Sequence, residues 1–348
     1  MDSEWRLDEL LSGRRPDRVP VFPFELRGFA AVDAGFPIAD AYRDADRSFG
    51  VQVRALEQYA LDGFPRYSYG AYGGWEFGGE VQFPQSEWQQ APTVRRHPAP
   101  DEEAVLALET PDPTSSGCLP IALAFSRLAR EHGRSVIPPI NGVFTTAGNV
   151  CGLDKLCRWT IRRPELAHRL LRVVTEHLIQ VVELWVSTFG PRIWGWTSEP
   201  SCSNQVISAR TFEEFVLPYE KELHERMLGL GIRHIMSHIC GDQNLNLQHW
   251  AKIPMGDPGV VTFGHEVDLD RAIEYMGGAC IIAGNVEPAI LQNGTLSNVY
   301  AACATAIEKG KRAPLGFVLM PGCSTPPYAS SDSVRTMVEA ATELGGYS

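Results

Sequence analysis

The sequence lacks an excess of basic residues. Its 31 Lys and Arg residues stand against 42 Asp and Glu residues, which gives a formal net charge of -11. A protein that binds nucleic acid needs a basic face for the phosphates, and a surface that binds anionic lipid needs one as well. The composition therefore argues against a nucleic-acid partner and against binding to a membrane surface.

Long apolar runs and closely spaced cysteines are absent too. No uninterrupted apolar run approaches the roughly 18 residues that suggest a membrane-spanning helix, and residues 1–20 lack the apolar core of a signal peptide. No CxxC pair occurs among the cysteines, which stand at positions 118, 151, 157, 202, 240, 280, 303 and 323. We expect a cytoplasmic protein without a disulfide scaffold, in which most cysteines are small buried side chains.

What the sequence contains is a repeated order of β-rich run, loop and amphipathic helical stretch. The candidate strands are 19–26, 61–69, 135–142, 192–198, 232–241, 259–266, 279–286 and 316–323. Strands that alternate with helices predict right-handed βαβ units and a parallel sheet, and this number of strands is typical of a closed (β/α)8 barrel. We therefore predict one domain over residues 1–348, a (β/α)8 TIM barrel. The stretch 70–118 is long for one connection and predicts an extra hairpin or a lid.

Metal-binding residue types gather at the carboxyl ends of the predicted strands, where barrel enzymes have their active sites. His238 and Cys240 end the strand at 232–241 and, being two residues apart, point to the same face. Cys323 ends the last strand. Zinc accepts imidazole and thiolate together, and a catalytic zinc commonly keeps three protein ligands and one open position. The sequence predicts such a zinc site, with Glu25 as a displaceable oxygen ligand.

A plainer interpretation of the same residues stays open at this point. An HxC pair alone is weak evidence for metal, because histidines and thiols are often buried for packing. Cys323 at a matching strand end strengthens the metal interpretation without deciding it. His234 lies deeper on the same strand face as His238, and we interpret it as a core residue.

Several motifs resemble the uroporphyrinogen decarboxylase superfamily, from about residue 5 to the C-terminus. They are RRPDRVPVFP, NGVFTTAGNVCGLDKL, ISARTFEEFVLPYEKEL, SHICGD, IAGNVEP and FVLMPGCSTPP. The similarity is to the zinc methyltransferase branch, of the methylcobamide:coenzyme M methyltransferase type. In that branch HxC and a distant cysteine in a P-G-C context bind zinc, so the resemblance implies His238, Cys240 and Cys323 as ligands.

The resemblance also implies a reaction. In such methyltransferases zinc activates a thiol, which attacks the methyl group of a methylated corrinoid carried by a partner protein. The chain lacks the DxHxxG-type motif of cobalamin carriers, so we expect the corrinoid, as co-substrate, on a separate carrier protein. The small-molecule partner stays open: a thiol, tetrahydrofolate or a methylated compound that is demethylated.

Two other functions remain. A porphyrinogen decarboxylase of this superfamily has an RQAGRY motif after its first strand, whereas this chain has ELRGFAAVDAG with Arg27 as the nearby arginine. Such enzymes also place an aspartate at the end of the second strand, and residues 65–79 contain none. A tetra-acid substrate would need several cationic partners. The other alternative is a non-catalytic member that binds a corrinoid or its carrier.

Polar residues at other strand ends are candidates for catalysis and substrate binding. Glu199 and Asn285 are predicted to orient substrate, although Glu199 can instead cap the helix that follows and Asn285 can be a turn residue. His265 is a candidate proton donor or partner of the metal ligands. Asn141 ends the strand at 135–142 and is a further candidate for substrate binding.

The glycine-rich segment 67–79 interleaves aromatic residues with glycines. Glycine lets the backbone approach a ligand closely, and aromatic rings offer flat apolar surface. We predict that Tyr67, Tyr69 and Trp75 contact a corrin ring or an aromatic methyl donor. The alternative is an ordinary loop whose rings cover the end of the barrel.

Overall fold

Parallel strands lie side by side in the order in which the chain forms them. The computed structural model describes residues 3–86 and 89–347, and within them one sheet has the order β3-β4-β5-β6-β7. These strands are Gly195–Ser198 (β3), Ile235–Ile239 (β4), Gly259–Phe263 (β5), Cys280–Val286 (β6) and Phe317–Pro321 (β7). Almost all of their residues are buried, as a parallel sheet covered by helices requires.

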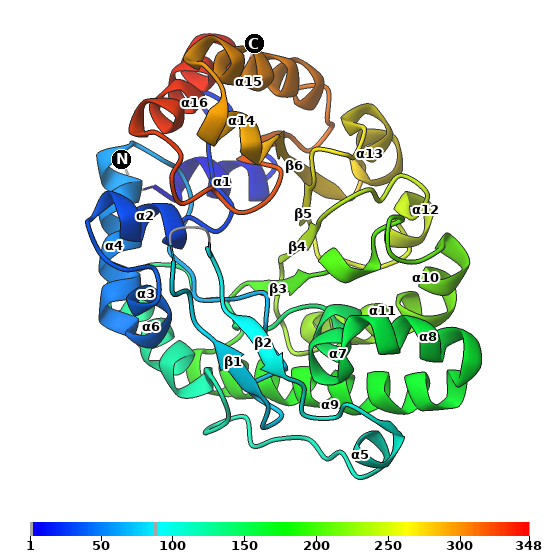
Figure 1. Ribbon diagram of the computed structural model, residues 1–348. Coiled ribbons are helices and arrows are strands. Elements are labelled where there is room, and N and C mark those ends of the chain that lie inside the picture. The colour runs from blue at the N-terminus through cyan, green and yellow to red at the C-terminus, as the bar shows by residue number, and fades with distance from the viewer. Residues whose placement is uncertain (1–2, 87–88, 348) are drawn as a thin grey trace.

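Helices surround these strands (Figure 1). They are α1 (Trp5–Leu11), α2 (Arg27–Asp33), α3 (Asp40–Arg43), α4 (Ala45–Gln58), α5 (Glu102–Leu106), α6 (Leu119–Glu131), α7 (Val143–Cys151), α8 (Leu153–Arg162), α9 (Pro164–Phe189), α10 (Ala209–Phe215), α11 (Leu217–Gly229), α12 (Leu247–Trp250), α13 (Leu269–Met276), α14 (Pro288–Asn293), α15 (Leu296–Gly310) and α16 (Ser331–Leu344). A short 3-10 helix, η1 (Pro200–Cys202), follows β3. None of the helices in the described ranges has the length and apolar character needed to cross a membrane.

The first three predicted strands are not regular strands, which corrects the sequence analysis. Residues 19–26, 61–69 and 135–142 run as irregular segments that join the ring through isolated backbone hydrogen bonds and not through a continuous ladder. These bonds include Leu319 N to Pro20 O (2.8 Å), Phe22 N to Leu319 O (3.1 Å), Asp62 N to Val21 O (2.8 Å), Trp194 N to Val136 O (2.9 Å) and Gly142 N to Ser198 O (2.9 Å). Proline interrupts all three segments, and a proline cannot donate to a strand ladder.

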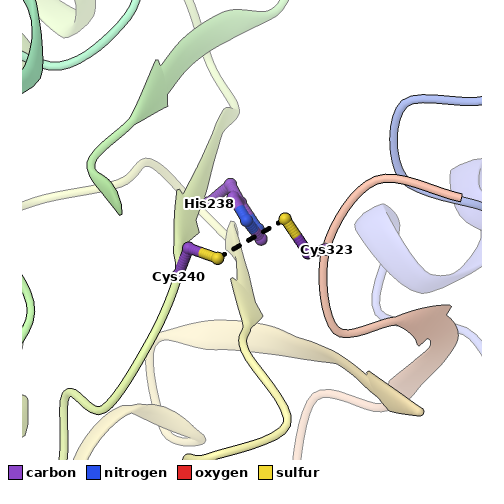
Figure 2. A group of neighbouring side chains, drawn as sticks. All are labelled: His238, Cys240 and Cys323. Carbon is purple, nitrogen blue, oxygen red and sulfur yellow. Dashed lines mark hydrogen bonds between the residues drawn. The ribbon is translucent and has the colours of Figure 1, made fainter. Parts of the chain in front are cut away.

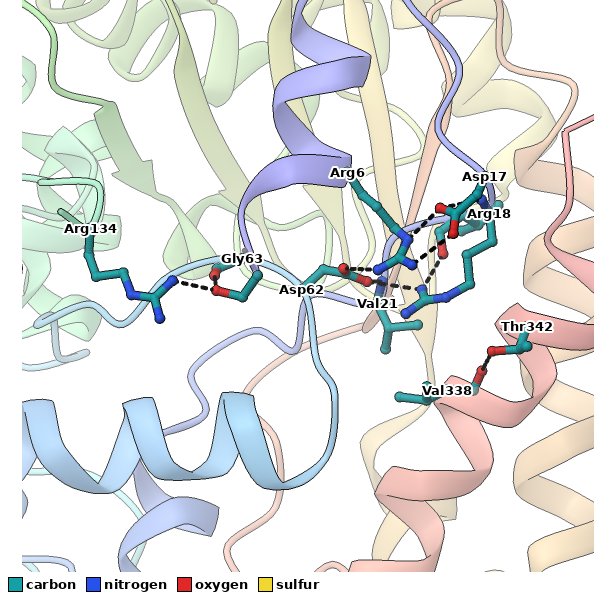
Figure 3. Close-up of polar contacts among 11 residues, drawn as sticks. Arg6, Asp17, Arg18, Val21, Asp62, Gly63, Arg134, Val338 and Thr342 are labelled. Atoms are coloured by element: carbon teal, nitrogen blue, oxygen red, sulfur yellow. Dashed lines mark hydrogen bonds and ion pairs between the residues drawn. The ribbon is translucent and has the colours of Figure 1, made fainter. Parts of the chain in front are cut away.

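A buried carboxylate ties two of these segments together (Figure 3). Asp62 accepts hydrogen bonds from Arg6 Nη1 and Arg18 Nη1, both at 2.9 Å, and from the backbone N–H of Val21 at 2.8 Å. Arg6 also pairs with Asp17. The Asp62 side chain is 2% exposed, so little water screens these pairs. This junction holds the segments in place where a regular ladder is missing.

The stretch 70–118, for which the sequence predicts an extra hairpin or a lid, contains two short antiparallel strands. They are β1 (Glu80–Gln82) and β2 (Thr93–Arg96). The connection between them is tied to the barrel where Tyr42 Oη donates to the carbonyl of Gln90 at 3.0 Å. Gln90 lines the cavity that contains the candidate metal ligands.

Candidate metal centre

Three potential metal ligands converge at the carboxyl ends of β4 and β7. His238 lies within β4, Cys240 follows its last residue, and Cys323 lies in the loop after β7. One ligand atom from each residue lies within 4.8 Å of the others, and the two Sγ atoms are 3.5 Å apart. Figure 2 shows the three side chains pointing toward one another from opposite sides of the barrel end. Two thiolates on one tetrahedral zinc lie about 3.8 Å apart, so this spacing suits the ion.

The imidazole of His238 is held with one nitrogen free. Its Nδ1 lies 2.5 Å from Thr262 Oγ1, and its ring stacks on Phe24 with the centroids 3.8 Å apart. Its Nε2 is buried and has no hydrogen-bond partner among the described residues. A buried polar atom without a partner is costly, and a metal ion would supply that partner. His234, by contrast, is half-buried with Nδ1 at 2.8 Å from Pro258 O, and it is not part of this group.

The two thiols share a hydrogen bond that separates their pKa values. Cys240 donates to the sulfur of Cys323. This hydrogen bond and the neighbouring His238 lower the pKa of Cys323 to about 4, against the opposing effect of burial. The same hydrogen bond, together with burial, raises the pKa of Cys240. The hydrogen bond therefore favours the thiolate form of Cys323, and the thiolate is the form in which cysteine binds metal.

Glu25 lines the same cavity, but its carboxylate is held by other groups. Ser68 Oγ donates to Oε1 at 2.5 Å, Arg66 Nη2 lies 3.2 Å from the same oxygen, and Arg27 Nη2 donates to Oε2 at 3.1 Å. Burial favours the neutral acid, yet the two guanidinium groups outweigh it and lower the pKa of Glu25. The structure does not bring Glu25 into the group of three ligand atoms.

Aromatic rings enclose both arginines. The guanidinium carbon of Arg27 lies 4.2 Å from the ring centroid of Tyr42, and that of Arg66 lies 4.3 and 4.1 Å from the centroids of Phe24 and Trp196. Burial lowers the pKa of Arg66 to about 10, so it stays protonated at neutral pH. Phe24 thus has Arg66 against its ring as well as the imidazole of the metal ligand.

The cavity beside the three ligands has a volume of about 160 Å³. Tyr69 and Asn141, both predicted to bind substrate, line it. Asn141 Nδ2 donates to the carbonyls of Tyr69 and Gly70, each at 3.2 Å, so its amide also fixes the start of the glycine-rich segment. Trp196 contributes an apolar wall.

Tyr67 and Trp75, predicted to contact substrate with Tyr69, do not line this cavity. Tyr67 is buried and donates its hydroxyl to the carbonyl of Tyr42 at 2.7 Å. Trp75 packs edge-on against Phe83, with the centroids 5.7 Å apart. Their contacts are those of rings that build the end of the barrel.

Glu199, predicted to orient substrate, is fully buried and caps a helix. Its Oε1 accepts from Phe144 N at 2.6 Å, and its Oε2 accepts from Thr145 N at 3.0 Å and Thr145 Oγ1 at 2.7 Å. These groups belong to the first turn of α7, which precedes Glu199 in the chain, whereas the sequence analysis considered the helix that follows. Burial and the nearby Glu220 carboxylate raise the pKa of Glu199.

His265 and Asn285 lie around a second cavity, of about 450 Å³, between the ends of β5 and β6 and the helix α15. Asn285 Nδ2 donates to the carbonyls of Gly264 and Val267 at 3.1 and 2.9 Å, so it holds the turn after β5. His265 is 39% exposed, with Nδ1 at 3.4 Å from a carboxylate oxygen of Glu266. Neither residue lines the cavity of the candidate metal ligands.

Family comparisons agree with the motifs at this site. The family described as uroporphyrinogen decarboxylase (URO-D) matches residues 3–344. The chain belongs to this family. It is 24% identical over 349 residues to a methylcobamide:CoM methyltransferase of Methanosarcina barkeri, with 97% of each protein covered.

Another relative is a methylated-thiol–coenzyme M methyltransferase of Methanosarcina mazei, 28% identical over 200 residues, which are 56% of this chain and 52% of that protein. The chain therefore matches about half the length of this relative. Among solved structures, a methyltransferase from Methanosarcina mazei has a TM-score of 0.82 at 20% identity, with 99% of each chain covered. The predicted (β/α)8 barrel is thereby confirmed.

Arg66 is a residue of this family member that the sequence analysis missed. The sequence feature that could have identified Arg66 is its position near the carboxyl end of the predicted strand 61–69, the end at which active-site residues are expected. Glu25 lines the cavity and pairs with Arg66 and Arg27, but neither arginine lines it. The cavity therefore does not present the cationic lining that a polycarboxylate substrate such as a porphyrinogen would need.

Proposed function

We propose that this protein transfers a methyl group between a corrinoid and a small molecule, and that it uses zinc held by His238, Cys240 and Cys323. The convergence of an unpartnered imidazole nitrogen and two hydrogen-bonded thiols beside a cavity carries this proposal. Both relatives named above are methyltransferases that use coenzyme M, which supports the same class of reaction for this chain.

The set of three metal ligands favours alkyl transfer. When bound, zinc supplies a site at which a small thiol loses its proton at neutral pH and becomes a nucleophile. Two thiolates and a neutral imidazole cancel the charge of the ion, so a sulfur bound beside them keeps much of its electron density. The residues of the chain hold these ligands, exclude water with Phe24 and Trp196, and leave the cavity open to one small molecule.

The size of the cavity supports separate places for the two substrates. Pockets that enclose drug-sized ligands have about 300–1,000 Å³, whereas this cavity has about 160 Å³. A corrin macrocycle is larger than such ligands and does not fit inside. The corrinoid therefore stays outside the barrel end, on a carrier protein that docks there, and the small methyl donor or acceptor occupies the cavity.

The test is consumption of methylcobalamin, followed by its absorbance change, with a panel of thiols and with tetrahydrofolate. We expect demethylation with at least one acceptor, or methylation of free cob(I)alamin from a methylated thiol, and loss of the activity when a chelator removes zinc. Binding of one cobalamin per chain without turnover of any acceptor would indicate a non-catalytic member. Release of CO₂ from a porphyrinogen after chelation would indicate a decarboxylase instead.

A further inference from the structure

The imidazole of His238 makes one hydrogen bond to the neighbouring strand. Parallel pairing of β4 with β5 places Thr262 directly opposite His238 in the register. The Thr262 hydroxyl lies 2.5 Å from Nδ1, and Thr262 is 1% exposed. On the far side of β5, the residue paired with Thr262 is Ala283, which offers no polar side chain. Among the described residues, His238 is thus the one hydrogen-bond partner of this hydroxyl.

We propose that Thr262 is a positioning residue for the candidate metal ligand His238. Its hydroxyl oxygen accepts the Nδ1 proton, so the Nε2 lone pair points at the space between the two thiols. This inference rests on the proposed zinc site and adds a residue that neither the family motifs nor the cluster of ligands contains.

The choice of tautomer decides whether His238 can bind a metal. A neutral imidazole has one N–H and one lone pair, and the hydrogen bond at one nitrogen sets which nitrogen keeps the lone pair. Nδ1 faces a hydroxyl, whereas Nε2 has no hydrogen-bond partner within the described chain. Without an acceptor opposite Nδ1, an N–H there would be buried and unpaired, so nothing would hold the proton away from Nε2, where it blocks the metal.

Phe24 fixes the orientation of the plane of the His238 imidazole. It stacks on the imidazole at an interplanar angle of 28°, and Arg66 and Trp196 lie behind it. Thr262 holds the edge of the imidazole while Phe24 holds its face. Rotation of the ring would break both contacts, so the ligand is oriented before any metal arrives.

The test compares Thr262→Val with Thr262→Ser in chelator-competition titrations with zinc. Valine keeps the shape of threonine but cannot accept the proton, so we expect the zinc affinity to fall about 10- to 100-fold. Serine keeps the hydroxyl and should stay within a few-fold of the natural chain. Thr197→Val is the matched control, because Thr197 is a buried threonine of β3 whose hydroxyl contacts a different histidine, His224, at 3.0 Å and Ser237 at 2.8 Å, and none of the three candidate ligands. It should leave the zinc affinity unchanged.

Nitrogen-15 chemical shifts of the His238 ring give a second readout that requires no turnover and no variant. In the zinc-loaded natural protein Nδ1 should carry the proton, and that proton should exchange slowly with water. Rapid exchange, or an unchanged zinc affinity in Thr262→Val, would overturn the proposal even if methyl transfer is observed. Conversely, a protein that binds zinc in a Thr262-dependent manner but transfers no methyl group would retain this inference and refute the proposed function.

Discussion

Replacement of Cys240 or Cys323 by serine should each reduce the zinc content from about one ion per chain to a small fraction of that value. A serine hydroxyl keeps its proton at neutral pH, so the site would lose one of its two thiolates and most of its affinity for zinc. The loss should exceed the ~10- to 100-fold that removal of an outer hydrogen-bond partner costs. Metal analysis of the purified variants measures the effect, and the rate of methylcobalamin consumption should fall with it.

Cys157→Ser is the matched control for this experiment. Cys157 is also a half-buried free cysteine, but it lies on α8, outside the group of candidate ligands. Its variant should keep both zinc and activity. Full retention of zinc in Cys240→Ser and in Cys323→Ser would instead show that these thiols are packing residues, and the proposed function would lose its basis.

The sequence predicts the regular half of the barrel well because buried parallel strands leave a clear pattern. The five strands β3 to β7 overlap the predicted ranges from 192–198 onward. The other three segments were predicted as strands from the same pattern, but prolines within them remove ladder donors. Contacts between distant residues replace the ladder there, as at Asp62 with Arg6 and Arg18. A pattern of neighbouring residues cannot reveal such contacts.

The residues of the candidate site also divide into those that the sequence could predict and those that it could not. His238 and Cys240 could be placed on one face because side chains in a strand alternate, and Cys323 could be placed at the same barrel end. Thr262 could not be found, because its role depends on the register between β4 and β5. Asn285 and His265 stand at strand ends as predicted but face another cavity. Being at the correct end of a barrel strand does not fix the direction in which a side chain points.

Glu25→Gln should destabilise the protein strongly, because Glu25 is the carboxylate between Arg27 and Arg66. Without it, the positive charges of two buried guanidinium groups would be uncompensated, and Nε and Nη1 of Arg27 already lack hydrogen-bond partners among the described residues. Breaking a buried ion pair by removing one partner costs about 3–5 kcal/mol, a large part of the roughly 5–15 kcal/mol that holds a folded protein together. We expect the Tm to fall by roughly 4–7 °C.

The stability of Glu25→Gln should also fall less at acidic pH than that of the natural chain. The folded-state pKa of Glu25 is lowered, so its contribution to stability is complete above the pKa of the unfolded chain and is lost as pH falls through the lower folded value. Glutamine has no such proton to bind, so this part of the acid destabilisation should disappear. Glu102→Gln is the matched control: Glu102 pairs with Arg163 on the surface, and such exposed pairs contribute only about 0–1 kcal/mol.

Zinc content separates the two roles that Glu25 can have. If the carboxylate serves only to hold the arginines, Glu25→Gln below its unfolding temperature should still bind about one zinc per chain with little change in affinity. If the carboxylate leaves Ser68 and the arginines to become a fourth ligand, the zinc affinity should fall together with the Tm. The three contacts at 2.5–3.2 Å favour the first result. Movement of the Glu25 carboxylate to the metal would break all of them and leave the two buried guanidinium groups without their counter-charge.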